Sequence, residues 1–204
     1  MLLDTCLLQH LQFVMDLLGE AFVWPDGTWA QLRRRYGPGL GEDLIALGEA
    51  IALMHPRVPP PWVVSETSLL EIERLGGPKG GALRAWWWEW AHFWEGCADD
   101  YPAVATVELA SHSAPIAPGQ LSLFEAPSCP LTERGAPLGP FEDAGDRALI
   151  RDALRAGVPA ILTTDLRSFW SRRRSLSHLG IEVWRPRDFL VALTRHLSPP
   201  SASP

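Results

Sequence analysis

Cysteine is scarce in this sequence, and its spacing does not match the usual cysteine-based sites. The 204 residues include three cysteines, Cys6, Cys97 and Cys129, with no C-x-x-C pair among them. An odd and sparse set argues against a structural zinc site and fits a protein of a reducing compartment. The six histidines show no H-x-x-x-H spacing, and the glycines around Pro78 and Lys79 do not form a nucleotide-binding motif.

The sequence also lacks long hydrophobic runs. No stretch of about 18 apolar residues occurs, which is the length that a membrane-spanning helix needs. The apolar N-terminus is interrupted by Asp4 and has no basic residues before it, so it does not resemble a signal peptide. We therefore expect a soluble, cytoplasmic protein without membrane contact.

Positive charge is in deficit, because 18 Lys and Arg residues face 24 Asp and Glu residues, for a formal net charge of −6. Such a surface as a whole does not attract nucleic acid, which counts against a passive nucleic-acid-binding protein. A nuclease is less affected, because a bound metal ion would neutralise some of the acid. Hydrophobic residues make up 47% of the chain, which is enough for a substantial core.

Short apolar segments alternate with helical patterns along the chain. Buried strands are predicted at residues 1–4, 62–65, 159–165 and 181–184. Apolar and capping patterns predict a final helix after Pro186 and earlier helices at 7–18, 41–54, 66–75, 80–96, 145–156 and 166–176. This alternation predicts an α/β fold, namely a three-layer α/β/α sandwich with a mostly parallel central sheet of four or five strands.

The chain is predicted to form a single domain over residues 1–197, followed by a disordered tail at 198–204. An insertion at about 77–140 contains a Trp-rich helix and then a loop rich in Pro, Ser and Gly. One face of this helix carries Leu83, Trp87, Trp90 and Trp94, while Trp88 points elsewhere. That face is expected to pack on the core or in a homodimer, and the alternative is that an exposed ring stacks on an unpaired base.

Acidic residues occur where the predicted strands end. Asp4 and Asp165 each end a strand, and Ser65 ends another. Glu71 lies in the helix after Ser65, and Asp146 opens the helix 145–156. Because ligands bind outside the carboxyl ends of parallel strands, the four acids are expected at one edge of the sheet. Clustered carboxylates repel one another unless a cation compensates, and oxygen-only ligation suits Mg²⁺ or Mn²⁺. The sequence therefore predicts a metal site that could hydrolyse a phosphate ester.

Some of these acids also have a purely structural interpretation. Asp146 could stabilise its own helix as an N-terminal acid, and Asp165 could act as an N-cap, each by about 0.5–2 kcal/mol. The presence of four acids at one edge favours the metal site over separate structural roles. Two assignments stay open, because Glu71 competes with Glu66 and Glu73, and Asp146 competes with Asp143.

Three stretches of the sequence resemble the PIN-domain family, which includes the ribonuclease toxins of toxin–antitoxin pairs. They are LLDTCLL at the start, VVSETSLLEI in the middle, and DRALIRDALRAGVPAILTTDLRSF through GIEVWRPRDFL near the end. The last stretch is the most specific, because an acid opens a helix, Gly157 follows it, and an apolar strand leads to T-x-D and the aromatic Phe169. The resemblance does not extend over about 16–58 and 77–140.

The resemblance implies roles for individual residues. The four acids of the family would be Asp4, Glu71, Asp146 and Asp165 in chain order. Thr163 corresponds to the small hydroxyl residue that supports the site, and Ser65 is expected to support the same edge. The family implies Mg²⁺- or Mn²⁺-dependent hydrolysis of phosphodiester bonds, usually in RNA. A toxin of this kind would also have an antitoxin partner.

Two further segments bear on the partner of this protein. A basic run follows Asp165 and consists of Arg167, Arg172, Arg173 and Arg174. These arginines could contact phosphates, or they could form a solvated helix face. The sequence QLSLF resembles the peptide by which bacterial replication and repair proteins dock to the sliding clamp, through Gln120, Leu121, Leu123 and Phe124. The alternative for QLSLF is local packing of its Leu and Phe side chains.

Three functions follow from these patterns. The favoured function is a metal-dependent endonuclease that acts on RNA. The second is a DNA-directed nuclease of replication, repair or defence that QLSLF recruits to the sliding clamp. The third is a PIN-like binding protein without catalytic activity.

Overall fold

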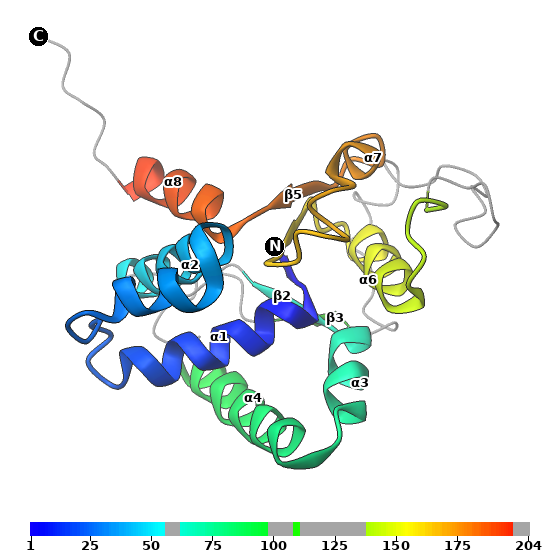
Figure 1. The fold of residues 1–204 in the computed structure, drawn as a ribbon. Helices are drawn as coiled ribbons and strands as arrows, with labels where there is room; N and C mark the ends of the chain where they lie inside the picture. The colour runs from blue at the N-terminus through cyan, green and yellow to red at the C-terminus, as the bar shows by residue number, and fades with distance from the viewer. Residues whose placement is uncertain (56–61, 98–107, 111–137, 198–204) are drawn as a thin grey trace, which may run out of the picture.

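The structure is a computed structural model, and it describes residues 1–55, 62–97, 108–110 and 138–197. At its centre lies a five-stranded sheet with the strand order β3-β2-β1-β4-β5 (Figure 1). The strands are β1 (Leu2–Leu3), β2 (Val63–Ser65), β3 (Glu108–Ala110), β4 (Ala160–Leu162) and β5 (Glu182–Trp184). All neighbouring strands pair in parallel. The predicted α/β class and parallel sheet are therefore confirmed.

Helices cover both faces of the sheet, as the three-layer prediction requires (Figure 1). They are α1 (Thr5–Leu18), α2 (Thr28–Met54), α3 (Glu66–Arg74), α4 (Gly77–Cys97), α6 (Ala144–Arg155), α7 (Arg173–Ser177) and α8 (Pro186–Leu197). Leu3, Val64 and Leu162 join buried residues of α1, α2 and α4 in one core. Leu2 and Ile161 join buried residues of α6 and α7 in a second core. Neighbouring strand residues thus face opposite layers, as the two-residue period of a strand requires.

Strands β1, β2 and β5 each pass directly into a helix at their carboxyl ends, and the first two have side-chain caps. Asp4 follows β1 with an extended backbone and caps α1, and its side chain accepts a hydrogen bond from the backbone N–H of Cys6. Ser65 ends β2 and caps α3 by accepting a hydrogen bond from the N–H of Ser68. Because capping residues are polar, this strand-to-helix geometry places polar side chains along the carboxyl edge of the sheet.

The predicted helix stop at Gly157 is confirmed. Gly157 has a φ of 63°, in the left-handed region that favours glycine. Its N–H donates to the carbonyl of Leu154 (3.3 Å), and the N–H of Val158 donates to the carbonyl of Ala153 (2.9 Å). This pair of bonds is a Schellman motif. It ends α6 and directs the chain into β4.

Helix α2 is longer than the sequence predicts. Its first half begins at Thr28 rather than at 41, and the chain bends at Gly37, whose φ is 74°. A Cβ at Gly41 would lie 2.9 Å from the carbonyl oxygen of Leu32, so the two halves approach closely at that point. The dense glycines and Pro38 conceal the first half because they resemble a loop. Within the described ranges, no helix is long and apolar enough to cross a membrane.

One other prediction about secondary structure is wrong, and one strand was not foreseen. Residues 166–172 form turns rather than the start of a helix at 166–176, and only α7 is helical there. Asp165 causes this difference, because its Oδ1 accepts hydrogen bonds from the N–H groups of Arg167 and Ser168 and holds a turn. Strand β3 lies inside the predicted insertion and was not predicted. Most of the Pro-rich loop, including QLSLF, and the tail lie outside the described residues.

In the Trp-rich helix α4, Leu83 and Trp87 are buried and Trp88 is 60% exposed, as the predicted face requires. The side chains of Trp90 and Trp94 lie outside the described part of the chain.

A buried carboxylate joins α2 to α8. Asp43 is fully buried, and its Oδ1 accepts a hydrogen bond from Nε of Arg187 (2.9 Å). Its Oδ2 accepts from Nε (2.9 Å) and Nη2 of Arg185. Both arginines also donate to the carbonyl oxygen of Gly39. Burial raises the pKa of Asp43, and the arginine bonds act in the opposite direction. The sequence analysis did not identify this network.

Replacing Asp43 by Ala is expected to lower the free energy of unfolding by about 3–5 kcal/mol, because it leaves the guanidinium of Arg185 without its buried partner. Glu42→Ala is the matched control on the same helix. It breaks an exposed pair with Arg33, whose exposed fraction is 48%, and should cost less than about 1 kcal/mol. Urea denaturation of both variants measures the two values. Equal losses would contradict the structural role of the buried pair.

Candidate functional site

Asp4 is the most deeply buried carboxylate at the carboxyl edge of the sheet, with 5% of its surface exposed. Its backbone N–H donates to the carbonyl of Leu162 in β4 (3.2 Å). Its Oδ2 accepts a hydrogen bond from the hydroxyl of Thr163 (2.6 Å), and its Oδ1 accepts from the N–H of Cys6 (3.3 Å). Neutral donors therefore hold this carboxylate in place.

Thr163 connects Asp4 to Asp165. The Oγ1 of Thr163 donates to Asp4 and accepts a hydrogen bond from the N–H of Asp165 (2.8 Å). The buried hydroxyl thus ties the acids that follow two adjacent strands, β1 and β4. The side chain of Asp165 uses Oδ1 to hold the turn that follows. The structural capping role considered for Asp165 is thus present, although it caps a turn and not a helix.

Asp146 lies in the first turn of α6. Its Oδ2 accepts a hydrogen bond from the hydroxyl of Ser168, which belongs to the turn after Asp165. Asp143 instead caps α6, because its Oδ1 accepts from the N–H groups of Gly145 (2.7 Å) and Asp146 (3.2 Å). The two competing acids therefore have different roles. Asp143 caps the N-terminus of α6, whereas Asp146 is bonded to the turn that Asp165 holds.

Glu71 reaches this edge from α3. Its Oε2 accepts a hydrogen bond from the hydroxyl of Thr5 (2.5 Å), the residue after Asp4. Its Oε1 lies so close to Gly145 that a Cβ there would be 2.0 Å from it. Thr67 donates to Asp152 of α6 (2.6 Å) and holds the two helices together. Glu71 is thus placed between the start of α1 and the start of α6.

The other residues proposed for this part of the site have different positions. Glu73 is exposed, and the side chain of Glu66 lies outside the described part of the structure. Ser65 is fully buried and bonds Ser68. Its hydroxyl thus supports the start of α3, and no described bond joins it to the four acids.

The electrostatic effect of these acids shows that they lie close together. Burial raises the pKa of Asp4 to about 7, the bonds from Thr163 and Cys6 oppose this, and the charges of Asp165 and Asp146 raise it further. Burial also raises the pKa of Asp146; the bond from Ser168 lowers it, and the charges of Asp143, Asp165 and Glu71 raise it.

Cys6 lies beside the same acids, and its backbone N–H bonds Asp4. The Cys6 residue keeps exposed surface, but the thiol group is partly withdrawn from water. This burial, followed by the negative charges of all four predicted acids, raises the pKa of Cys6 to about 12. The hydrogen bonds give the same arrangement: Thr163 joins Asp4 to Asp165, Thr5 beside Asp4 bonds Glu71, and Ser168 in the turn after Asp165 bonds Asp146. The structure therefore brings the four predicted acids to one place.

No basic side chain in the described ranges pairs with these four carboxylates. His10 bonds the hydroxyl of Thr164 through Nδ1 (2.8 Å), but burial lowers its pKa, so its imidazole is neutral at pH 7. As the side chains stand, no three His, Cys, Asp or Glu of the described residues are close enough to hold a metal ion. The described residues thus bring four acids together without a basic partner.

A basic turn borders the cluster. It runs from Asp165 into α7 and carries the predicted arginines Arg167, Arg172, Arg173 and Arg174. None of the four forms an ion pair with a described carboxylate. The guanidinium of Arg173 lies 4.4 Å from the ring centre of Trp170, and that of Arg172 lies 5.7 Å from the ring of Phe141. The turn thus presents positive charge and aromatic surface beside the acids.

The sequence analysis missed the hydroxyl partners Thr5 and Ser168. Thr5 could have been identified from the sequence, because it directly follows Asp4 and a hydroxyl residue beside one acid of the site can donate a hydrogen bond to a second acid, here Glu71. Ser168 gave no such signal, because it lies 22 positions from Asp146. Its role depends on the turn that replaces the predicted helix.

Replacing Asp4 by Asn is expected to stabilise the metal-free protein near neutral pH. The pKa of Asp4 is about 7 in the folded protein and 3.8 in the unfolded chain. Between these values the folded state binds more protons, so its stability falls as the pH rises from about 4 to about 7. At 1.36 kcal/mol per pKa unit this loss is at most about 4 kcal/mol. Asn carries no charge and can still accept the bond from Thr163, so the variant avoids the loss.

Thermal unfolding in EDTA at pH 4 to 8 measures this effect. The stability difference between Asp4→Asn and the wild type should be small at pH 4 and grow up to about pH 7. Glu73→Gln, an exposed acid on α3, serves as the control and should show no such growth. A difference that does not change with pH would contradict the raised pKa of Asp4.

Comparison with protein-family models, with curated proteins and with solved structures found no match in any of the three.

Proposed function

We propose that this protein is a metal-dependent endonuclease with a PIN-like fold, and that RNA is its favoured substrate. The observation that carries the proposal is the charge of the acidic edge. Four carboxylates reach it from separate segments, and no described basic side chain neutralises them. Without a cation, Asp4 stays protonated up to about pH 7 and this relieves part of the repulsion, whereas a bound divalent cation would relieve it with all four carboxylates ionised.

The chemistry of the donor set fits a hard divalent cation. Mg²⁺ and Mn²⁺ prefer carboxylate oxygens, which all four residues offer. Oδ1 of Asp146 and Oδ2 of Asp165 have no hydrogen-bond partner among the described residues, and the same holds for Oε1 of Glu71. Asp4, Glu71 and Asp165 would hold the ion, and Asp146 would complete the cluster. The bound ion would lower the pKa of water and stabilise charge on the phosphate.

The neutral hydroxyls of the chain orient the carboxylates. Thr163 holds Asp4, Thr5 holds Glu71, and Ser168 holds Asp146. Each bond uses one oxygen and restricts the rotation of its carboxylate. Asp4 retains a proton up to about pH 7 while the site has no cation, so metal binding should release this proton and tighten as the pH rises through that value.

The basic turn supports a nucleic-acid substrate. Its arginines are not paired with described acids, so they are available to phosphates. Because the turn begins at Asp165, a phosphate held there lies beside the acidic edge. The chain as a whole has a net charge of −6, so this basic turn is the surface that would attract a phosphate. The preference for RNA rests on the PIN-like resemblance.

The proposal is tested by cleavage of labelled single-stranded RNA and DNA of the same sequence with Mn²⁺. The wild type should cleave, with RNA preferred, and EDTA should abolish cleavage. Asp4→Asn should lower the rate by at least about 100-fold, because it removes a charged ligand of the ion. Asp146→Asn should lower it too. Asp143→Asn is the matched control, since Asn caps a helix as well as Asp does and the control should retain activity.

Gly145→Ala tests the geometry without removing a carboxylate. Its Cβ would lie 2.0 Å from Oε1 of Glu71, so Glu71 must turn away, and 2.9 Å from Oδ1 of Asp143, which caps α6. We expect activity to fall about 10- to 100-fold, while the loss of stability stays below about 2 kcal/mol, the value for a lost cap, because Ala favours a helix over Gly. Full activity of purified Asp4→Asn with Mn²⁺ would remove the mechanism. Preferred cleavage of DNA would replace the favoured substrate and keep the mechanism.

A further inference from the structure

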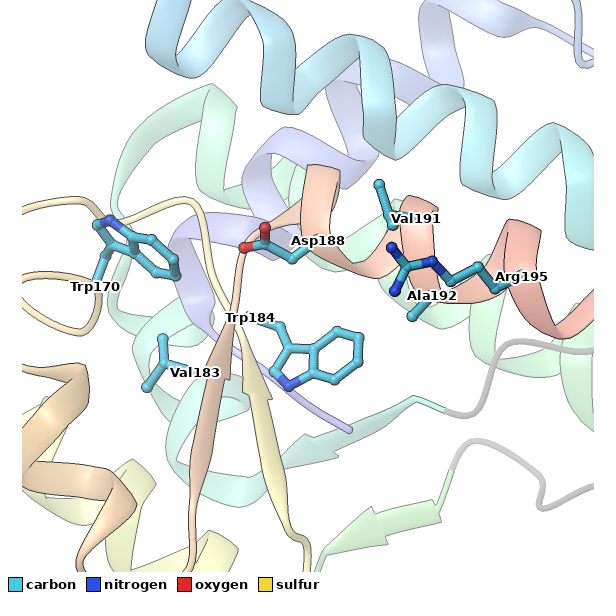
Figure 2. Close-up of a pocket in the computed structure, with 7 residues that line it drawn as sticks. All are labelled: Trp170, Val183, Trp184, Asp188, Val191, Ala192 and Arg195. Atoms are coloured by element: carbon cyan, nitrogen blue, oxygen red, sulfur yellow. The ribbon is translucent and has the colours of Figure 1, made fainter.

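A groove lies beside the acidic edge, on the outer strand β5 and helix α8 (Figure 2). It has a volume of about 430 Å³, and its lining includes Trp170, Trp184, Asp188, Val191 and Arg195. This volume is at the lower end of the about 300–1,000 Å³ typical of small-ligand pockets. In Figure 2 the two indole rings and the guanidinium of Arg195 surround the same opening, with the carboxylate of Asp188 between them.

The groove is directly connected to the acidic cluster. The carbonyl oxygen of Trp184 accepts a hydrogen bond from the N–H of Thr163 (3.0 Å), and Thr163 binds Asp4. The N–H of Trp170 donates to the carbonyl oxygen of Asp165 (3.2 Å). Both tryptophans are therefore one hydrogen bond away from residues that hold or form the cluster.

The groove combines aromatic surface with positive charge. Arg195 lines the groove, and Arg173 lies over the ring of Trp170 at 4.4 Å. Arg185 also lies over that ring at 5.5 Å, but its charge is paired with Asp43. The Nε1 of Trp184 donates to Glu182 (2.7 Å), which restricts the orientation of that ring. Val191 is 49% exposed and adds apolar surface. Sites for single-stranded nucleic acid combine these two features, since bases stack on aromatic rings while arginines follow the phosphates.

Asp188 adds an acceptor for polar groups of a base. Its Oδ2 accepts a hydrogen bond from the N–H of Arg185 (3.2 Å), which fixes the carboxylate at the start of α8. Its Oδ1 has no hydrogen-bond partner among the residues described. A carboxylate can accept hydrogen bonds from the amino and imino groups of a base. A purely apolar ligand would leave this acceptor and Arg195 unused.

We propose that this groove binds an unpaired base of a single-stranded nucleic acid, while the phosphates follow the basic turn toward the acidic edge. This inference rests on the proposed nuclease function and adds the strand state of the substrate. In a duplex the bases are stacked on one another, so the groove rings have no free base to contact. Single strands are therefore selected over duplexes by the groove and not by the acids.

Binding is measured by fluorescence anisotropy with the Asp4→Asn background, so that cleavage does not interfere. The probes are a labelled 12-nucleotide single-stranded RNA, its duplex, and an abasic strand with the same number of phosphates. The base-bearing single strand should bind about 5- to 150-fold more tightly than the abasic strand, which is the range for stacking of one base. Trp184→Ala should reduce the ratio of the two affinities, base-bearing strand over abasic strand, toward one. Trp184→Phe should restore this ratio.

Two further variants separate the groove from general effects. Val191→Asp, at an exposed position, should also lower the ratio, and it covers the case in which Trp184→Ala does not fold. Trp29→Ala is the matched control, because Trp29 is an exposed tryptophan (41%) on α2. It should leave the ratio unchanged.

Equal binding of base-bearing and abasic strands by the protein would overturn the inference, and so would absence of binding to either probe. Unchanged ratios in both Trp184→Ala and Val191→Asp would overturn it as well. Failure of the nuclease function has a different signature, namely no Mn²⁺-dependent cleavage by the wild type. Base-dependent binding through the groove can be observed even in that case.

Discussion

Repulsion among four carboxylates held at one sheet edge is the constraint on which the rest of this site depends. Asp4 has lost most of its contact with water, and the neighbouring charges raise its pKa further. Hydroxyl and amide groups donate hydrogen bonds to the carboxylates and fix their orientation, but they supply no positive charge. The arginines nearby lie on the adjacent turn and do not form ion pairs with the acids. Binding of a cation at this edge would lower the electrostatic repulsion among the carboxylates. The arginines of the turn are not used to neutralise the acids, so they remain available for phosphates.

The fold and the position of the acids could be predicted from the sequence because both follow from local patterns. Short apolar strands that alternate with helices require a covered parallel sheet, and the acids that follow such strands must meet at its carboxyl edge. Asp4 and Asp165 are therefore placed by topology alone. Gly157 could be predicted as a helix stop because only the left-handed conformation ends α6 in this way. The choice of Glu71 over Glu73 needed three-dimensional information, since both lie on the same helix and only Glu71 faces Thr5 and Gly145.

The remaining features depend on contacts between distant residues. The bond from Ser168 to Asp146 exists because Asp165 holds residues 166–172 as a turn, and helical periodicity could not indicate this. The network of Asp43, Arg185 and Arg187 joins residues more than 140 positions apart, so no spacing pattern marks it. It also has a functional consequence, because Arg185 lies against Trp170 and so connects the packing of α2 on α8 to the groove. Acids, basic turn and groove thus share one edge of the sheet, although only the first two were apparent from the sequence.

The most direct test of the metal-site claim is a crystal structure of the protein soaked in Mn²⁺, with the ion located by its anomalous scattering. We expect a peak at the carboxyl edge of the sheet, at about 2 Å from oxygens of Asp4 and of at least one of Glu71, Asp146 and Asp165. A structure without a peak at this edge at saturating Mn²⁺ would contradict the metal-site claim. So would a structure in which arginine side chains pair with these carboxylates and leave no space for an ion.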